Sequence, residues 1–159
     1  MAAYTIAQMR TAGVNPATTD SAGFPGDVVI DYELDGLKKA VAATDTVDFF
    51  EIPAYAGFIP TAAAITVVRA GTATGTVDLQ IGGADVPGLT GWATDATAGT
   101  KLVKLATGVV SGAVNTPSAV INTTTASYIR LQQNTAALGS GKIRVRVFGT
   151  LLESPSAQA

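Results

Sequence analysis

The sequence predicts an all-β protein: an eight-stranded antiparallel β-sandwich, jelly-roll-like, with an extended N-terminal arm. Several short segments alternate apolar and polar residues with a period of two, which is the period of a strand. Gly and Pro separate these segments, and none of the chain shows the apolar period of an amphipathic helix. A length of 159 residues suits one domain of ordinary size.

Three regions are expected along the chain. Residues 1–27 show no useful strand or helix period and contain three Gly and two Pro, which is typical of an extended arm. Residues 28–152 carry the predicted strands and form the jelly-roll-like domain. Residues 153–159 are polar and are expected to form a C-terminal tail. The arm packs either on its own domain or on a neighbouring subunit, and the sequence leaves both open.

The first four predicted strands are regular. They cover residues 28–35, 45–52, 58–70 and 76–81. In the first strand, apolar and acidic residues alternate from Ile30 to Asp35, so the acidic side chains share one face.

The last four predicted strands follow a long loop over residues 83–99. They cover residues 101–106, 119–122, 127–133 and 141–148. The final strand alternates apolar and basic residues, so its basic side chains share one face. In the seventh strand, Ile129, Leu131 and, with weaker support, Tyr128 are the candidates for burial.

The jelly-roll order makes a pairing prediction, because its first and last strands are antiparallel neighbours in one sheet. The pairing would set three carboxylates against three cations: Asp31, Glu33 and Asp35 against Arg146, Arg144 and Lys142. Cross-strand pairs of this kind contribute roughly 0.2–1 kcal/mol each, so they fix the register more than they stabilise the fold.

The composition excludes much chemistry. The chain has no Cys and no His, which removes disulfides, thiolate nucleophiles, and the commonest general base and metal ligand. Charged residues make up 14% of the chain and the net charge is −2, which gives no basic surface for nucleic acid. No apolar run is long enough for a transmembrane helix. The N-terminus lacks the pattern of a signal peptide, so we expect synthesis in the cytoplasm and no membrane partner.

No motif in the chain carries a catalytic or metal site. The run Asp31-x-Glu33-x-Asp35 resembles half of a calcium loop, but Ala42 stands where the bidentate Glu would be needed. The Gly141-Lys142 pair lacks the Ser or Thr of a phosphate loop and precedes a strand. We therefore expect no catalytic, cofactor or metal residues, and no enzymatic activity.

One stretch resembles a known class of proteins. Residues 50–82 contain Ile-Pro-Ala, a Val-rich strand, a Thr/Gly turn and then Thr-Val-Asp-Leu-Gln-Ile-Gly. This order, with the late Gly-Lys-Ile-Arg-Val-Arg-Val strand, is similar to the small capsid-associated proteins of tailed bacteriophages. The resemblance extends over about residues 28–150 and consists of packing motifs.

The resemblance implies a decoration, or cement, protein on the outside of the virion head. Such a protein clamps neighbouring subunits of the major capsid protein and is commonly a homotrimer. On this hypothesis the arm contributes contact residues to the capsid or to a neighbouring subunit. The candidates are Tyr4, Ile6, Met9, Val14 and Phe24.

Two alternatives stand beside this hypothesis. One is another virion component, such as the base of a head fibre or a tail protein. The other is a carbohydrate-binding β-sandwich, which needs exposed aromatic side chains. Trp92 and Tyr55 are the only loop candidates for such a contact.

Overall fold

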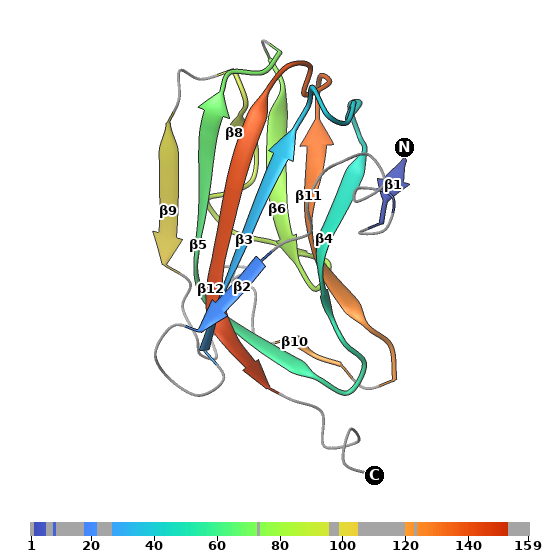
Figure 1. Ribbon diagram of the computed structural model, residues 1–159, viewed down its shortest axis with the longest axis vertical. Coiled ribbons are helices and arrows are strands. Elements are labelled where there is room, and N and C mark those ends of the chain that lie inside the picture. The colour runs from blue at the N-terminus through green and yellow to red at the C-terminus, as the bar shows by residue number, and fades with distance from the viewer. Residues whose placement is uncertain are drawn as a thin grey trace.

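The chain folds into two β-sheets that pack face to face (Figure 1). A computed structural model describes residues 2–5, 8, 18–21, 27–72, 74–95, 99–104, 120–122 and 124–152. The predicted all-β sandwich is confirmed.

Sheet A has the strand order β1-β4-β11-β6-β7, and β8 also pairs with β6. Its strands are β1 (Ala3–Tyr4), β4 (Thr46–Ile52), β6 (Thr76–Ile81), β7 (Ala84–Asp85), β8 (Trp92–Ala93) and β11 (Ser127–Asn134).

Sheet B has the strand order β10-β5-β12-β3-β2, and β9 also pairs with β5. Its strands are β2 (Thr18–Ser21), β3 (Asp27–Asp35), β5 (Gly57–Arg69), β9 (Thr100–Lys104), β10 (Val120–Ile121) and β12 (Lys142–Leu152).

The connectivity is that of a jelly roll. Eight strands form it, and they can be numbered one to eight in chain order: β3, β4, β5, β6, β8, β9, β11 and β12. In sheet B the order is then 6-3-8-1, and in sheet A it is 2-7-4-5. All the pairings among these eight strands are antiparallel. Two interleaved Greek keys give this order.

The predicted pairing of the first and last strands is confirmed in its register. β12 runs antiparallel to β3, and the structure pairs Lys142 with Asp35, Arg144 with Glu33 and Arg146 with Asp31. The apolar residues between them face the core, because neighbouring residues of a strand point to opposite sides.

The strand prediction was wrong between β6 and β11. The expected loop over residues 83–99 contains β7 and β8, and β8 takes the fifth place of the jelly roll. The segment predicted as the fifth strand is β9, which takes the sixth place, and the one predicted as the sixth is β10, a short strand beside β5. Two-residue strands are too short for an alternation to mark them in sequence.

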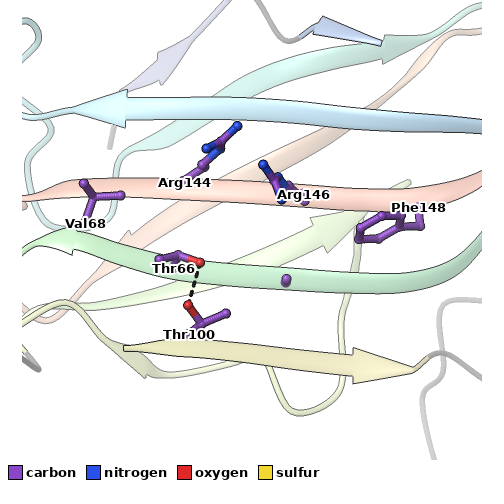
Figure 2. A pocket seen from close by; sticks show the side chains of 7 residues that line it. Thr66, Val68, Thr100, Arg144, Arg146 and Phe148 are labelled. Carbon is purple, nitrogen blue, oxygen red and sulfur yellow. Dashed lines mark hydrogen bonds between the residues drawn. The ribbon is translucent and has the colours of Figure 1, made fainter. Parts of the chain in front are cut away.

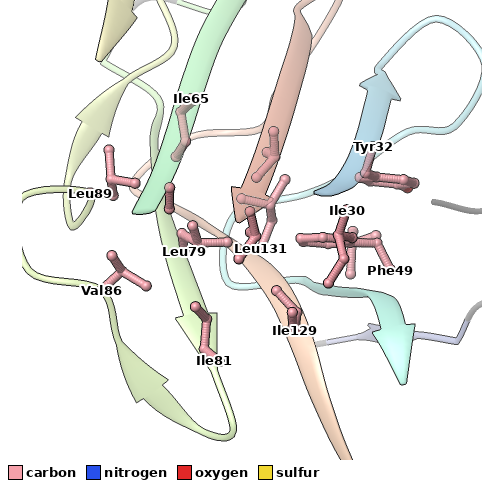
Figure 3. Close-up of a cluster of buried hydrophobic side chains, with 14 of the residues drawn as sticks. Ile30, Tyr32, Phe49, Ile65, Leu79, Ile81, Val86, Leu89, Ile129 and Leu131 are labelled. Carbon is pink, nitrogen blue, oxygen red and sulfur yellow. The ribbon is translucent and has the colours of Figure 1, made fainter. Parts of the chain in front are cut away.

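The core lies between the two sheets, where the inward side chains of both meet (Figure 3). Ile65 of β5 and Leu79 of β6 are fully buried there, one from each sheet. At one side of the core, the rings of Tyr32 and Phe49 stack with their centroids 4.7 Å apart. Ile129 and Leu131 are core residues as predicted, whereas Tyr128 lies on the outer side of β11 and is half-buried.

A bulge in sheet A shifts the alternation of β4. Ile129 pairs with Phe50 and Arg130 pairs with Asp48, so Phe49 is the extra residue on β4. Both Phe49 and Ile52 therefore reach the core, which a strict period of two does not allow.

The described parts of the arm add strands to the edges of both sheets. β1 runs parallel to β4, and β2 runs antiparallel to β3. These pairings occupy backbone groups of edge strands that would otherwise be open to other chains. The division at residues 27 and 152 stays a prediction.

Candidate interaction surface

The outer face of sheet B carries a groove of about 370 Å³ (Figure 2). Its volume lies near the lower end of the range for ligand pockets. β5, β9 and β12 line it, with the residues Ala64, Thr66, Val68, Thr100, Arg144, Arg146 and Phe148.

Small side chains on β5 form the floor of the groove. Ala63, Ile65 and Val67 point into the core and are fully buried, so the intervening residues must point outward. Those outward residues are Ala64, Thr66 and the exposed Val68, and they are shorter than the side chains of β12 beside them. The Thr66 and Thr100 hydroxyls hydrogen-bond to each other at 2.9 Å, which ties β9 to the floor.

Two arginines of β12 form one wall, and a single carboxylate of β3 holds them. The Arg144 guanidinium donates from Nε and Nη2 to the two oxygens of Asp31, at 2.9 and 2.5 Å. Among the described residues, the Arg146 side chain donates only to this carboxylate, from Nε at 3.2 Å. The bidentate geometry is the stronger of the two arrangements.

The charges next to the groove do not cancel one another. The carboxylates of Asp31, Glu33 and Asp35 face the cations of Arg69, Lys142, Arg144 and Arg146. Asp27 is a fourth outward carboxylate of β3, and it accepts a hydrogen bond from the Thr150 hydroxyl. Next to the groove, however, Arg144 and Arg146 share the single carboxylate of Asp31, which leaves a local excess of one positive charge. Since Arg144 takes both oxygens of Asp31, the least neutralised cation is Arg146.

The hydrogen bonds between Asp31 and Arg144 shift the pKa of both groups. The hydrogen bond from Arg144 lowers the pKa of Asp31 below its usual value, against the opposing effect of partial burial. The hydrogen bond to Asp31 also raises the pKa of Arg144. Asp31 therefore remains ionised at neutral pH, and both arginines stay charged.

The outer face of sheet A is different, because its polar side chains bond to one another. Gln80 donates to Asp85 at 2.8 Å and to Gln132 at 3.2 Å, and Asn134 donates to Asp78 at 2.7 Å. Asp78 also accepts the Gly91 N–H at 2.6 Å. We call this set of side chains, Asp78, Gln80, Asp85, Gln132 and Asn134, the amide face.

Beside the amide face lies a more deeply buried ion pair. The Nε of Arg130 lies 2.8 Å from Asp48 Oδ1, close enough for an ion pair but off the line of a good hydrogen bond. Burial raises the pKa of Asp48, and the opposing effect of Arg130 does not fully offset it. This carboxylate therefore shifts in the opposite direction to Asp31 on sheet B.

Of the predicted arm contacts, only Tyr4 lies in the part of the chain that the structure describes. It is half-buried on β1 beside β4, and the Lys39 Nζ lies 4.4 Å from the centre of its ring. Burial and the neighbouring Asp45 raise the pKa of Tyr4. The other predicted arm contacts fall outside the described residues: Ile6, Met9, Val14 and Phe24.

The carboxylate of Asp45 anchors this end of the arm. It accepts the Ala2 N–H at 2.8 Å and the Ala42 N–H at 2.9 Å. The Thr46 N–H also donates to the Ala2 carbonyl at 2.8 Å. At this point the arm is bound to its own domain.

The two predicted loop contacts lie in different surroundings. Trp92 pairs with Val77 on the sheet and packs half-buried against the core, with the Lys101 Nζ 5.3 Å from its ring centre. Tyr55 stands in the turn between β4 and β5, with a φ of 62° and half of its surface exposed. Of the two, Tyr55 is the more exposed to solvent.

The groove was not predicted from the sequence. The sequence places the basic side chains of β12 on one face, but their neighbours on β5 and β9 depend on the strand order. One sequence feature points to the floor of the groove, namely the run of small residues from Ala62 to Ala64 in β5. The Arg and Phe residues beside this run in the groove belong to another strand, β12. Within the described ranges, no group of three or more Asp or Glu side chains could hold a metal ion, and no helix is long and apolar enough to cross a membrane.

Comparisons with known proteins give two structural similarities. A chain from the capsid of Ralstonia phage GP4 aligns with a TM-score of 0.45 and 16% identity, over 85% of this chain and 89% of that one. A capsular polysaccharide depolymerase, the tailspike protein gp49 of Acinetobacter baumannii bacteriophage Fri1, aligns with a TM-score of 0.31 and 13% identity.

The tailspike alignment covers 95% of this chain but only 22% of the tailspike chain. No protein-family model and no curated protein sequence matches this chain. With identities below 25% and TM-scores below 0.5, neither structural alignment identifies a function.

Proposed function

We propose that this chain is a structural virion protein that binds the outside of a bacteriophage capsid and cements neighbouring subunits of the major capsid protein. It acts without catalysis or a cofactor, and as a homotrimer. The observation that carries the proposal is the contrast between its two outer faces. The amide face bonds to itself, whereas the face of sheet B presents a groove with exposed apolar and cationic side chains.

The fold supports a role in binding rather than in chemistry. The two sheets share one core, so both outer faces are held rigidly, and a rigid face loses little entropy on binding. β1 and β2 occupy backbone groups at the edges of the two sheets, which limits uncontrolled strand pairing. With these edges occupied, a partner is expected to bind an outer face of the sandwich rather than these sheet edges.

The sequence resemblance supports the same role. The stretch 50–82 that resembles capsid-associated proteins ends β4 and continues through β5 and β6. The floor of the groove belongs to this stretch, since β5 supplies Ala64, Thr66 and Val68. The segment that suggests a capsid role thus also builds the candidate surface.

The proposal is tested with capsids that lack the protein. The purified chain is added to them, and bound protein is measured by co-sedimentation while particle rupture is followed during heating. A cement protein binds with a fixed number of copies per particle and raises the rupture temperature. Absence of binding would contradict the proposal, and binding with an unchanged rupture temperature would contradict the cementing role.

A second experiment addresses the arm. Deletion of residues 1–25 is expected to weaken attachment to the capsid while the domain stays folded, because the arm adds contact area. Co-sedimentation measures attachment, and circular dichroism checks the fold. Unchanged attachment of the shortened chain would remove the arm from the interface.

A further inference from the structure

Arg146 is the residue on the face of sheet B whose charge is least satisfied. Within the part of the chain that the structure describes, the only hydrogen bond of its side chain is the one from Nε to Asp31, at 3.2 Å. Its side chain is 46% exposed. Since no described residue bonds to the terminal nitrogens of its guanidinium group, these nitrogens can bind an anion.

The remaining lining of the groove is mostly apolar. Ala64, Val68 and Phe148 lie beside the two arginines, and Val68 is 44% exposed. Figure 2 shows Arg144, Arg146 and Phe148 following one another along β12, with Thr66 and Val68 on the neighbouring strand. A ligand that fills this groove needs an anionic group next to an apolar one.

We propose that the groove binds an acidic segment of the capsid partner, with a carboxylate on Arg146 and an aliphatic side chain against Val68 and Ala64. This inference rests on the function proposed above and names the surface through which it acts. A carboxylate matches the planar, forked donors of a guanidinium group. In an extended segment, the residue two positions away points to the same side and supplies the apolar contact.

The charge pattern of the face favours this occupant. Asp31 already uses both of its oxygens on Arg144, so a second carboxylate near Arg146 meets a net positive charge. A basic segment would instead meet two guanidinium groups at the groove. The carboxylate of an acidic partner would thus neutralise the positive charge that Asp31 leaves at the two arginines.

The central experiment removes the charge of Arg146. Arg146→Gln is expected to weaken binding to capsids that lack the protein by roughly tenfold or more, as for the loss of a charged hydrogen bond. Lys38→Gln is the matched control, because it removes one exposed positive charge from the turn after β3, away from the groove lining. Co-sedimentation measures both variants, and thermal unfolding confirms that each is folded.

A second variant should act in the opposite direction. Asp31→Asn removes the carboxylate that competes for the two arginines, so it is expected to tighten binding severalfold. A general loss of structure could not produce this gain. Weaker binding of Asp31→Asn in a folded protein would overturn the proposal.

A third pair tests the apolar part of the groove. Val68→Glu places a carboxylate where the partner's acidic segment should lie, and it is expected to reduce binding at least tenfold. Leu37→Glu is the matched control, since Leu37 is 69% exposed and lies in the turn after β3, outside the groove lining.

The outcomes separate the two proposals. If the unmodified chain fails to bind capsids, the proposed function is wrong. If the unmodified chain binds but Arg146→Gln and Val68→Glu bind equally well, only the groove is excluded as the capsid-binding surface. If these variants change the number of chains in the oligomer but leave capsid binding intact, the groove joins copies of this chain and the inference is overturned.

Discussion

The two outer faces of this sandwich use polar residues in different ways. On the amide face, side chains from β6 and β11 donate to and accept from one another across the strands. On sheet B, one carboxylate holds two arginines beside a floor of small residues. The polar side chains of the amide face thus bond mainly to one another, whereas the face of sheet B leaves guanidinium donors and apolar surface open to a partner.

The largest loss of stability is expected in the hydrophobic core, which lies under both outer faces. Leu79→Ala under the amide face and Ile65→Ala under the groove should each lower the free energy of unfolding by about 2–5 kcal/mol, because each removes a fully buried side chain. Urea unfolding followed by Trp92 fluorescence measures both variants. A loss of less than 1 kcal/mol at one site would show that the two sheets do not depend equally on one core.

The next largest loss of stability is expected from breaking an ion pair, and it should differ between the two faces. Arg130→Gln leaves the largely buried Asp48 carboxylate without its cation and should cost about 2 kcal/mol at pH 7. Arg144→Gln breaks an exposed pair on the other face and should cost less than about 1 kcal/mol. Equal losses of stability in the two variants would contradict the difference in burial.

The two faces should also respond oppositely to acid. The raised pKa of Asp48 means that its protonated form is favoured in the folded state, so its contribution to stability falls as the pH rises through that pKa. The lowered pKa of Asp31 means that its contribution is present above the unfolded value of 3.8 and is lost as the pH falls through the folded pKa.

Carboxyl NMR titration measures these two groups directly. Asp48 should titrate above 3.8 and Asp31 below it. Asp31→Asn should therefore cost more stability at pH 7 than at low pH, while Asp48→Asn should relieve a penalty that is present only at the higher pH. The reverse order of the two midpoints would contradict the assignment of the buried and the bridged carboxylate.

The smallest loss of stability is expected from weakening the contact between the arm and its domain. Asp45→Asn weakens the acceptors of the Ala2 and Ala42 N–H groups, and we expect a loss of about 1 kcal/mol. The pKa of Asp45 is lowered because these hydrogen bonds outweigh its burial, so this stability should also be lost as the pH falls below 3.8. Hydrogen exchange of the Thr46 N–H, which bonds to the Ala2 carbonyl, reports the release of the arm.

The sequence predicted the regular strands because their own side chains specify them. In β3 and β12, alternating apolar and charged residues define both the buried face and the register, and the structure has that register. The sequence did not predict β8, since Trp92 and Ala93 gain their strand geometry from pairing with β6. Tertiary context, and not local pattern, decides such short elements.

The candidate surface was harder to predict than the fold. Arg144 and Val68 are 76 positions apart in the chain, and only the pairing of β12 with β5 brings their strands together. The sequence showed a basic stripe and a run of small residues but not that they line one groove. Four of the five predicted arm contacts lie outside the described residues, so those predictions stand untested.

The proposed capsid role is tested most directly by electron cryomicroscopy of phage particles assembled with this chain. We expect density for a two-sheet sandwich on the outside of the head, in contact with more than one major-capsid subunit. The face of sheet B should turn toward the capsid, with Arg146 at the interface. The absence of such density from the head, or its location in the tail, would contradict the account.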